Sequence, residues 1–224
     1  MKEPQTREKQ YQFLLERRRK GLAKFGLMSS QVWQDDPRRL AFLLARYKFV
    51  AKMLSGLDHV LEIGCADAFG TRIVKQEVKR MTVTDFDQIF IDNAIETMDE
   101  RWPYAAQVHD MLNGPIAENF DAAYALDVIE HINAAHEDVF VGNIVKSLGA
   151  HGIVILGCPS LASQPHASPP SKAGHVNCKD GPAMKELLQR FFHNVFVFSM
   201  NDEVVHTGFY PMAHYVIGIG CGQR

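Results

Sequence analysis

From residue 59 onward, short apolar runs alternate with longer stretches of helix-forming residues. Five apolar runs can be marked, at 59–63, 81–84, 104–108, 122–126 and 152–157, with helical stretches at 70–78, 88–98 and 137–148 between them. Strands that alternate with helices of this length build parallel sheets covered by helices on both faces. The alternation therefore predicts an α/β fold with a doubly wound, mainly parallel sheet.

The last third of the chain departs from this alternation. Residues 158–181 are rich in Pro, Ser and Gly and too long for a simple connection, so they are either disordered or a lid over a site. A helical stretch at 182–190 follows, and then two apolar runs at 194–198 and 214–219. No helix-length connection separates those two runs, so we expect them to pair antiparallel.

The N-terminal part is predicted to be helical. Residues 7–24 favour an amphipathic helix lying on the domain through Tyr11, Leu14, Leu15, Leu22 and Phe25. Asp36 and Pro37 are typical of an N-cap and first helical position, which predicts a second helix running to about Leu54. We expect two units: an N-terminal helical cap at 1–56 and the α/β domain at 57–224. The basic run 17–20 is more simply a solvated helix face than a phosphate or lipid contact.

Composition narrows the function classes. The 224 residues are 46% hydrophobic and carry a formal net charge of −2, which gives no basic field for nucleic acid. No segment approaches the apolar length of a membrane span, the N-terminus is too polar for a secretion signal, and the four cysteines form no CxxC pair. We therefore expect a cytoplasmic protein with reduced thiols and a small-molecule partner, and the apolar N-terminal helix could form a homodimer contact.

Acidic residues stand at the ends of three consecutive predicted strands. Glu62, Asp85 and Asp110 would all lie at the carboxyl edge of a parallel sheet, which is where such folds bind ligands. Carboxylates also begin helices as N-caps, so each acid alone would indicate little. Three acids at one edge favour a cofactor site.

The turn after the first strand, "EIGCADAFG", constrains the ligand. A dinucleotide-binding site typically has the motif GxGxxG, which lets backbone amides approach a pyrophosphate. Here Ala66 and Ala68 stand where further glycines would be expected. Glu62, two residues before Gly64, instead points to a cationic or amino-bearing ligand. The turn therefore disfavours a nicotinamide dinucleotide.

These motifs resemble those of the class I S-adenosylmethionine-dependent methyltransferases. "EIGCADAFG" keeps that family's acid, first glycine and Gly70, and "TVTDFD", "QVHDML" and "FDAAYALDVIEHI" match its later strand-end motifs in order. The resemblance implies a seven-stranded sheet with an antiparallel last strand, Asp85 on the ribose hydroxyls, Phe86 on the adenine ring and Asp110 on the adenine amino group. The implied cofactor-binding residues are Glu62, Gly64, Cys65, Ala66, Asp85, Phe86, Asp110, Met111 and Asp127.

Methyl transfer from this cofactor needs alignment of the acceptor and, for a hydroxyl or ammonium acceptor, a base. His131, after the fourth strand, is the candidate base; a structural hydrogen bond to the following loop is the alternative. Asp127, Glu130 and His131 form D-x-x-E-H, which resembles the ExxEH arrangement that binds a magnesium-type ion in some family members. We expect no resident metal; these three residues are the set that would hold a divalent one.

Polar residues late in the chain are candidates for acceptor contact: His166, His175, Asn201, Glu203 and His206. The alternative is that they lie in solvated loops. The leading hypothesis is methyl transfer to an oxygen or nitrogen of a polar small molecule, such as a sugar or phosphate-bearing metabolite of surface polysaccharide synthesis. The alternatives are a nicotinamide-dependent oxidoreductase and a noncatalytic domain that binds adenosylmethionine.

Overall fold

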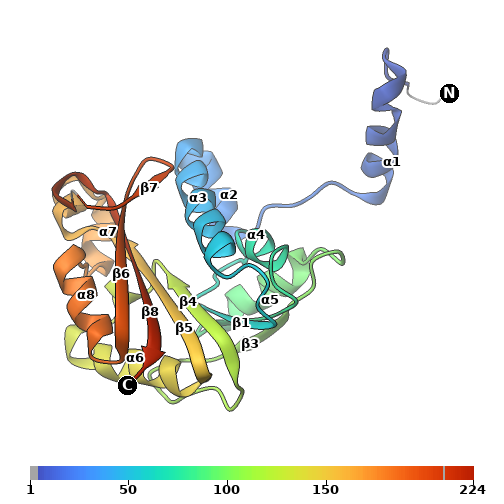
Figure 1. Cartoon of the computed structure of the whole chain (residues 1–224). Helices are drawn as coiled ribbons and strands as arrows, with labels where there is room; N and C mark the ends of the chain where they lie inside the picture. The colour runs from blue at the N-terminus through green and yellow to red at the C-terminus, as the bar shows by residue number, and fades with distance from the viewer. Residues whose placement is uncertain (1–4, 209) are drawn as a thin grey trace.

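The computed structural model describes residues 5–208 and 210–224, and its centre is an eight-stranded sheet (Figure 1). The strands run in the order β3-β2-β1-β4-β5-β8-β6-β7. Strands β1 to β5 pair parallel, whereas β8 pairs antiparallel with both β5 and β6. Their bounds are β1 His59–Ile63, β2 Arg80–Asp85, β3 Ala105–Val108, β4 Phe120–Leu126, β5 Leu148–Pro159, β6 Phe192–Asn201, β7 Val204–His206 and β8 Tyr215–Gln223.

Helices cover both faces of the sheet. One core cluster joins the sheet to α3, α4 and α5, and a second joins the opposite face to α6 and α8. The helices are α1 Gln12–Lys20, α2 Leu27–Asp35, α3 Pro37–Met53, α4 Thr71–Lys75, α5 Gln88–Thr97, α6 Glu137–Lys146, α7 Pro169–Gly174 and α8 Gly181–Gln189. Short 3-10 turns lie at Lys9–Tyr11, Ile129–His131, Ala134–His136, Leu161–His166 and Tyr210–Met212. None of the helices in the described residues is both long and apolar enough to cross a membrane.

The predicted α/β fold is confirmed, including the antiparallel pairing near the C-terminus. The predicted count of seven strands was one too few, because three residues of the 201–208 hairpin pair with the end of β6 as β7. Helix α2 was also not predicted. Its residues include three consecutive polar side chains, Ser29 to Gln31, so the apolar spacing of a helix is weak there.

Helix α3 forms as the sequence indicated and is part of the main core. Asp36 accepts a hydrogen bond from the Arg38 amide at the N-cap, and Pro37 takes the first helical position. The buried residues of α3 include Tyr47 and Val50, which pack in the same cluster as β1. This helix therefore lies on the sheet beside the first glycine turn.

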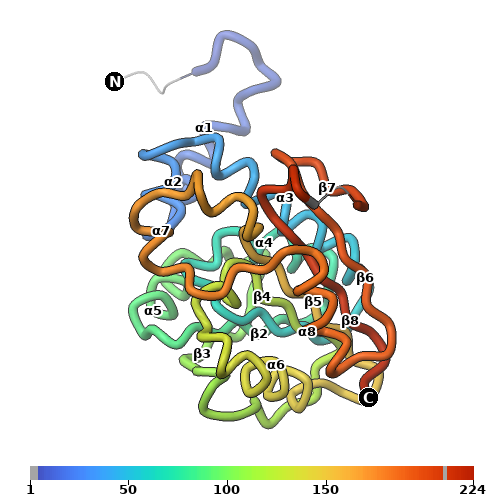
Figure 2. Tube along the Cα trace, turned by 90° about the vertical axis from the view of Figure 1, so that its left-hand side faces the viewer, coloured from blue at the N-terminus to red at the C-terminus, as the bar shows by residue number. Residues whose placement is uncertain are grey.

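Helix α1 does not lie on the domain, so that prediction was wrong. It stands away from the rest of the molecule and contains no buried residue (Figures 1 and 2). The physical reason is Gly21, whose φ of 98° ends the helix, so Leu22 and Phe25 do not continue the face that carries Leu14. Leu14 is 46% exposed and Leu22 is 73% exposed.

The stretch 158–181 is an ordered cover rather than a disordered loop. Ser160 caps the turn at Leu161–His166, and Ser168 caps α7. Its C-terminal end is fixed by a buried ion pair in which the Lys179 ammonium lies 2.5 Å from a carboxylate oxygen of Glu137. A lid-like segment is thus anchored to α6.

Candidate functional site

The turn between β1 and α4 has a left-handed backbone at three positions, two of which are alanine. Gly64, Ala66 and Ala68 all have left-handed backbone conformations, with φ of 71°, 47° and 53°. A side chain at Gly64 would collide with Val128, since a Cβ there would lie 2.4 Å from its Cγ2. The alanines therefore adopt the conformation that glycine adopts with less strain. Buried Cys65 lies between them, and burial raises the pKa of its thiol.

Asp85 connects this turn to the end of β2. One carboxylate oxygen accepts the Ala66 amide at 3.0 Å and the other accepts the Asp87 amide at 3.0 Å. A carboxylate has about four acceptor positions, so two remain for further hydrogen bonds. Burial raises the pKa of Asp85 above its ordinary value. The neighbouring Phe86 ring is 74% exposed, at the end of the same strand.

Glu62 is enclosed beneath the turn rather than exposed at the edge. Only 1% of it is exposed, and its carboxylate accepts hydrogen bonds from the Tyr47 hydroxyl at 2.8 Å, Thr71 Oγ1 at 2.6 Å and the Tyr124 hydroxyl at 2.7 Å. Burial raises the pKa of Glu62 to about 7, against the opposing effect of the three hydroxyls. The carboxylate ties α3, α4 and β4 to β1, a role that the sequence did not reveal.

Asp110 and Met111 both follow β3, but the side chain of Asp110 lies near the surface and that of Met111 lies in the core. Asp110 accepts the Leu112 amide at 2.9 Å, as an acid that begins a turn does. The Met111 side chain is 2% exposed and packs in the core against the α6 face, while its carbonyl accepts Asn143 Nδ2 at 2.7 Å. Of the two, Asp110 is the one whose side chain lies nearer the surface.

The start of α2 is attached to the glycine turn by Asp67. Its carboxylate accepts both the amide and the hydroxyl of Ser29, each at 2.7 Å. Gly26 is packed so closely on Asp67 that an added Cβ would lie 2.3 Å from the Asp67 Cβ. Helix α2 therefore covers the turn, and a glycine followed three residues later by serine was the only signal in the sequence.

Asp127, at the end of β4, is paired with an arginine from α3. Arg46 Nη1 lies 2.8 Å and 2.7 Å from the two carboxylate oxygens, and its guanidinium carbon sits 3.8 Å from the centre of the Tyr215 ring. Asp127 has a φ of 58°, and its amide bonds to the Gly157 carbonyl at 2.9 Å. Sequence reasoning missed Arg46, although a charge within the apolar spacing of Leu43, Tyr47 and Val50 was a usable signal.

Unpartnered buried polar atoms gather around Arg46. Among the described residues, the buried side-chain atoms without a hydrogen bond are Arg46 Nε, both carboxyl oxygens of Glu130, His214 Nε2 and the Tyr215 hydroxyl. Burial raises the pKa of Glu130 to about 9, and burial together with the charge of Arg46 lowers the pKa of His214. Such groups in a folded protein call for a functional explanation.

Tyr215 reaches this cluster because β5 has a glycine opposite its hydroxyl. A Cβ at Gly157 would lie 2.7 Å from the Tyr215 oxygen. Since Tyr215 pairs with Pro159 at the start of β8, its ring lies at the carboxyl edge of the parallel strands. The cluster therefore shares an edge with the glycine turn.

His131 and His175 are brought together although they are far apart in the sequence. Their ring centres are 5.1 Å apart. His131 Nδ1 lies 3.0 Å from the Gly174 carbonyl and His175 Nδ1 lies 3.1 Å from Gln164 Oε1. Both partners are acceptors, so each Nδ1 carries a proton, and in the neutral form of each imidazole Nε2 holds the lone pair. Glu130 lies beside them, with one ligand-type atom from each residue within 4.8 Å of the others.

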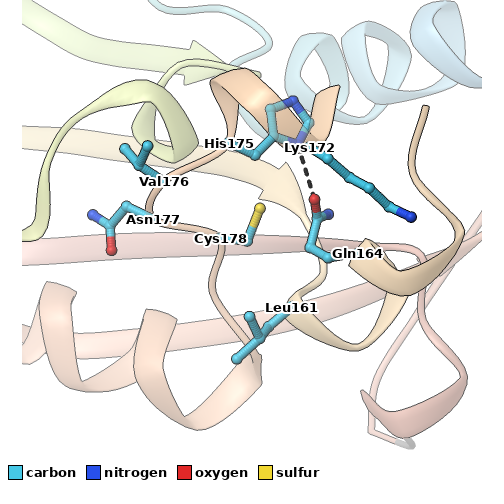
Figure 3. Close-up of a pocket in the computed structure, with 7 residues that line it drawn as sticks. All are labelled: Leu161, Gln164, Lys172, His175, Val176, Asn177 and Cys178. Carbon is cyan, nitrogen blue, oxygen red and sulfur yellow. Dashed lines mark hydrogen bonds between the residues drawn. The ribbon is translucent and has the colours of Figure 1, made fainter. Parts of the chain in front are cut away.

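A pocket of about 280 Å³ lies next to this pair (Figure 3). Gln164, Lys172 and His175 bring polar atoms to it, and Cys178 lies between them and Leu161 in the close-up. Its walls come from the lid-like segment 158–181. The predicted acceptor residue His175 is therefore at a cavity, whereas His166 is exposed at the end of the Leu161–His166 turn.

The remaining candidates lie in the β6–β7 hairpin. His206 Nε2 donates to Asn201 Oδ1 at 2.7 Å, and His206 Nδ1 lies 3.0 Å from Ser199 Oγ. Glu203 is exposed at the tip of the hairpin. These side chains are bonded mainly to one another, and no contact joins them to His131 or His175 in the described structure.

Comparisons with known proteins agree with the fold and the turn. Residues 61–156 match the family model described as a methyltransferase domain, which runs from β1 into β5. This match covers less than half of the chain, and the sheet around it has the fold of the solved methyltransferase structures described next. A search of the curated proteins found no match to the chain.

Solved structures share this fold at low sequence identity. The N-methyltransferase NodS from Bradyrhizobium japonicum WM9, in complex with S-adenosyl-L-homocysteine, is 20% identical with a TM-score of 0.62 over 85% of this chain and 90% of that chain. The DhpI complex with the same ligand is 14% identical with a TM-score of 0.63, over 87% and 92%. A methyltransferase bound to the Trm112 activator of Haloferax volcanii is 12% identical with a TM-score of 0.66, over 86% and 97%.

Proposed function

We propose that the chain transfers the methyl group of S-adenosylmethionine to an oxygen or nitrogen of a polar small molecule, such as a sugar or phosphate-bearing metabolite of surface polysaccharide synthesis. The observation that carries the proposal is the pair of imidazoles, His131 and His175, each bonded through Nδ1, of which His175 lines a cavity and His131 contacts His175. A polar acceptor suits such lining. The cofactor supplies an activated methyl group, so the protein mainly aligns the acceptor and excludes water.

The residues proposed to hold the cofactor lie along the ends of β1 to β4. Asp85, with two acceptor positions left, would take the ribose hydroxyls; exposed Phe86 would pack on the adenine; and Asp110 would take its amino group. The backbone at Gly64, Cys65 and Ala66 would approach the remaining part of the ligand, with Met111 and Asp127 flanking it. Glu62 would act through the hydroxyls that it binds, since it is itself enclosed.

His131 is the proposed base. With Nδ1–H donated to Gly174, the imidazole presents Nε2 to accept the proton that a hydroxyl or ammonium acceptor loses. The products are then the methylated acceptor, the demethylated cofactor and a proton on His131 that passes to solvent. His175 would hold the acceptor in the adjoining pocket.

Calorimetry and a turnover screen test this proposal. Adenosylmethionine should bind with a dissociation constant in the micromolar range, whereas NAD and NADP should not bind. A metabolite screen that reads formation of the demethylated cofactor should then find the acceptor. For that acceptor, His131→Ala should lower turnover at least 100-fold with cofactor affinity within about twofold of wild type, and exposed His136→Ala serves as the matched control. Binding of NAD instead, or full turnover in His131→Ala, contradicts the proposal.

A metal-assisted form of the reaction is a second candidate, favoured by the unpartnered carboxyl of Glu130. The predicted set was Asp127, Glu130 and His131, but Asp127 is occupied by Arg46. His175 takes its place in the group that fits an ion. Two imidazoles and one carboxylate suit zinc or manganese better than magnesium. Such an ion would polarise the acceptor oxygen and assist its deprotonation.

Titration of metal-free protein separates the two forms. After treatment with a chelator, calorimetry with Zn²⁺, Mn²⁺ and Mg²⁺ should show one site that His175→Ala abolishes. Lack of binding by all three ions, or binding that survives His175→Ala, eliminates the metal-assisted form and leaves the base mechanism standing.

A further inference from the structure

The N-terminal arm, residues 5–24, contains no buried residue. Its helix α1 has no buried residue, and it projects away from the sheet in both views (Figures 1 and 2). Tyr11, Phe13 and Leu14 are each between 46% and 52% exposed. A nine-residue helix is marginal alone in water, so a partner surface would stabilise it.

The arm and the rest of the chain have opposite charge. Between residues 5 and 24 there are seven Lys and Arg and two Asp and Glu, a net charge of +5. The whole chain carries −2, and residues 1–4 contribute zero, so residues 25–224 carry −7. A basic arm on an acidic body is complementary to a second copy of the same body.

Other anionic partners fit the arm less well. A helix that lies in a lipid interface needs its apolar side chains gathered on one face and its polar side chains on the other, but Phe13, Leu14 and Leu15 are consecutive and spread over about 200° of the helix surface. Nucleic acid would also require a basic surface on the body, and the body is acidic. The arm therefore suits a surface that offers both apolar and acidic side chains.

Helix α5 carries such a surface. Its inner side packs Ile91 and Ala94 in the core, and its outer side exposes Ile89, Asp92, Ile95 and Glu96. Ile89 is 55% exposed and Ile95 is 50% exposed. The spacing places two isoleucines and two carboxylates on one stripe, which matches apolar Phe13 and Leu14 followed by basic Arg17 and Arg18.

The root of the arm lies beside α5 of its own body. The Leu27 amide donates to Asn93 Oδ1 at 2.8 Å, and the Phe25 ring lies 5.0 Å from the Phe69 ring of the glycine turn. From there α1 points away rather than back along α5. In a two-fold pair, each arm would therefore begin next to the stripe that the partner's arm needs, which is the geometry of an isologous exchange.

We propose that two copies of this chain exchange N-terminal arms, each α1 docking on the α5 stripe (Ile89, Asp92, Ile95 and Glu96) of the other copy. Apolar contacts drive the association. Arg17 and Arg18 of α1 pair with Asp92 and Glu96 and so fix the register of the docked helix. The proposed interface adjoins Phe25, which packs on the glycine turn. Each copy therefore helps to hold α2 over the glycine turn of the other copy.

Charge reversal in the full-length chain tests the exchange. Analytical ultracentrifugation at about 0.15 M salt should show a dimer, and its dissociation constant should rise with salt because the contact is partly electrostatic. Arg17→Glu with Arg18→Glu should raise the dissociation constant at least tenfold, as should Asp92→Lys with Glu96→Lys. Combining all four changes should restore it to within about threefold of wild type. Lys146→Glu with Lys185→Glu, both exposed on the body, is the matched control and should have no effect.

Each outcome decides the proposal. A monomer at 100 µM overturns it, as does a dimer that the arm or α5 reversals leave unchanged, or a four-change variant that stays monomeric while thermal unfolding shows it to be folded. Cosedimentation with vesicles of phosphatidylcholine and phosphatidylglycerol is measured in parallel. A monomer that binds these vesicles and loses binding on Arg17→Glu with Arg18→Glu assigns the arm to a lipid surface instead.

Discussion

Two buried glutamates lie at the carboxyl edge of the same sheet, and their surroundings are opposite. Glu62, near the end of β1, accepts hydrogen bonds from three hydroxyls. Glu130, after β4, is equally buried, yet neither carboxyl oxygen has a partner in the described structure. The part of the edge that we propose to hold the cofactor is thus internally satisfied, and the part that we propose to hold the acceptor is not.

This difference indicates that the proposed cofactor half recognises its ligand through side chains of fixed geometry. On the cofactor side, Asp85 and the backbone of the glycine turn hold each other through the Ala66 amide. On the acceptor side, Arg46, Tyr215 and Glu130 are assembled from α3, β8 and the β4 loop and retain unused donors and acceptors. A site that always binds the same ligand benefits from side chains that are already held in place. The unpartnered groups would instead gain hydrogen-bond partners only when the acceptor or an ion binds.

The largest expected effect comes from removing the satisfied glutamate. Glu62→Leu leaves the hydroxyls of Tyr47, Thr71 and Tyr124 buried without their acceptor, so the free energy of unfolding should fall by about 3–4 kcal/mol. Glu62→Gln, which keeps an acceptor oxygen, should lose less than half of that. Urea denaturation measures both; equal stability of Glu62→Leu and wild type would show that the hydroxyl cluster contributes nothing.

The pH dependence of that glutamate gives the next effect. Its pKa is raised from 4.5 to about 7 in the folded state, so the neutral carboxyl is the favoured form there. The stabilising contribution is complete below pH 4.5 and is lost as the pH rises through 7. The difference in unfolding free energy between wild type and Glu62→Gln should therefore fall by roughly 1 kcal/mol per pH unit across that window. A pH-independent difference contradicts the raised pKa.

Cofactor affinity tests the other satisfied carboxylate. Asp85→Ala removes the acceptor for ribose and releases the Ala66 amide, so the dissociation constant of adenosylmethionine should rise about 100-fold. Asp110→Ala should cost less, about tenfold, because it would contact one amino group. Calorimetry on folded variants measures both. An Asp85→Ala variant with wild-type affinity would place the cofactor elsewhere.

The unsatisfied half should respond in the opposite direction. Glu130→Leu removes a buried carboxyl that makes no hydrogen bond in the described structure. The free energy of unfolding should therefore rise by about 1–2 kcal/mol. Turnover of the identified acceptor should fall at the same time. A destabilised Glu130→Leu variant would mean that this carboxyl does have a structural partner, and the contrast with Glu62 would fail.

Some of this contrast could be predicted from the sequence and some could not. The alternating pattern and the strand-end acids Glu62, Asp85 and Asp110 follow local rules of strands and turns, and from them the sequence predicted the sheet and the edge that we propose to hold the cofactor. His131 and His175 meet only because the 158–181 segment folds back over the β4 loop, which no local pattern encodes. Arg46 was overlooked because its partner Asp127 lies 81 residues later, so a charge on a helix looked like solvated surface.

The smallest effect concerns the two alanines that made the motif ambiguous. Ala66 and Ala68 have φ of 47° and 53°, where a Cβ is strained by roughly 1 kcal/mol, partly offset by the extra freedom that glycine gains in the unfolded chain. Ala66 is half-buried, so removing its Cβ costs few packing contacts. Ala66→Gly should therefore be more stable than wild type by about 0.5 kcal/mol. Ala68 is 2% exposed and packs in the core, so Ala68→Gly should gain nothing because it forfeits those contacts. Denaturation midpoints of the two variants decide this. A stabilised Ala68→Gly beside an unchanged Ala66→Gly would contradict this assignment, because relief of backbone strain would then outweigh the core contacts of Ala68.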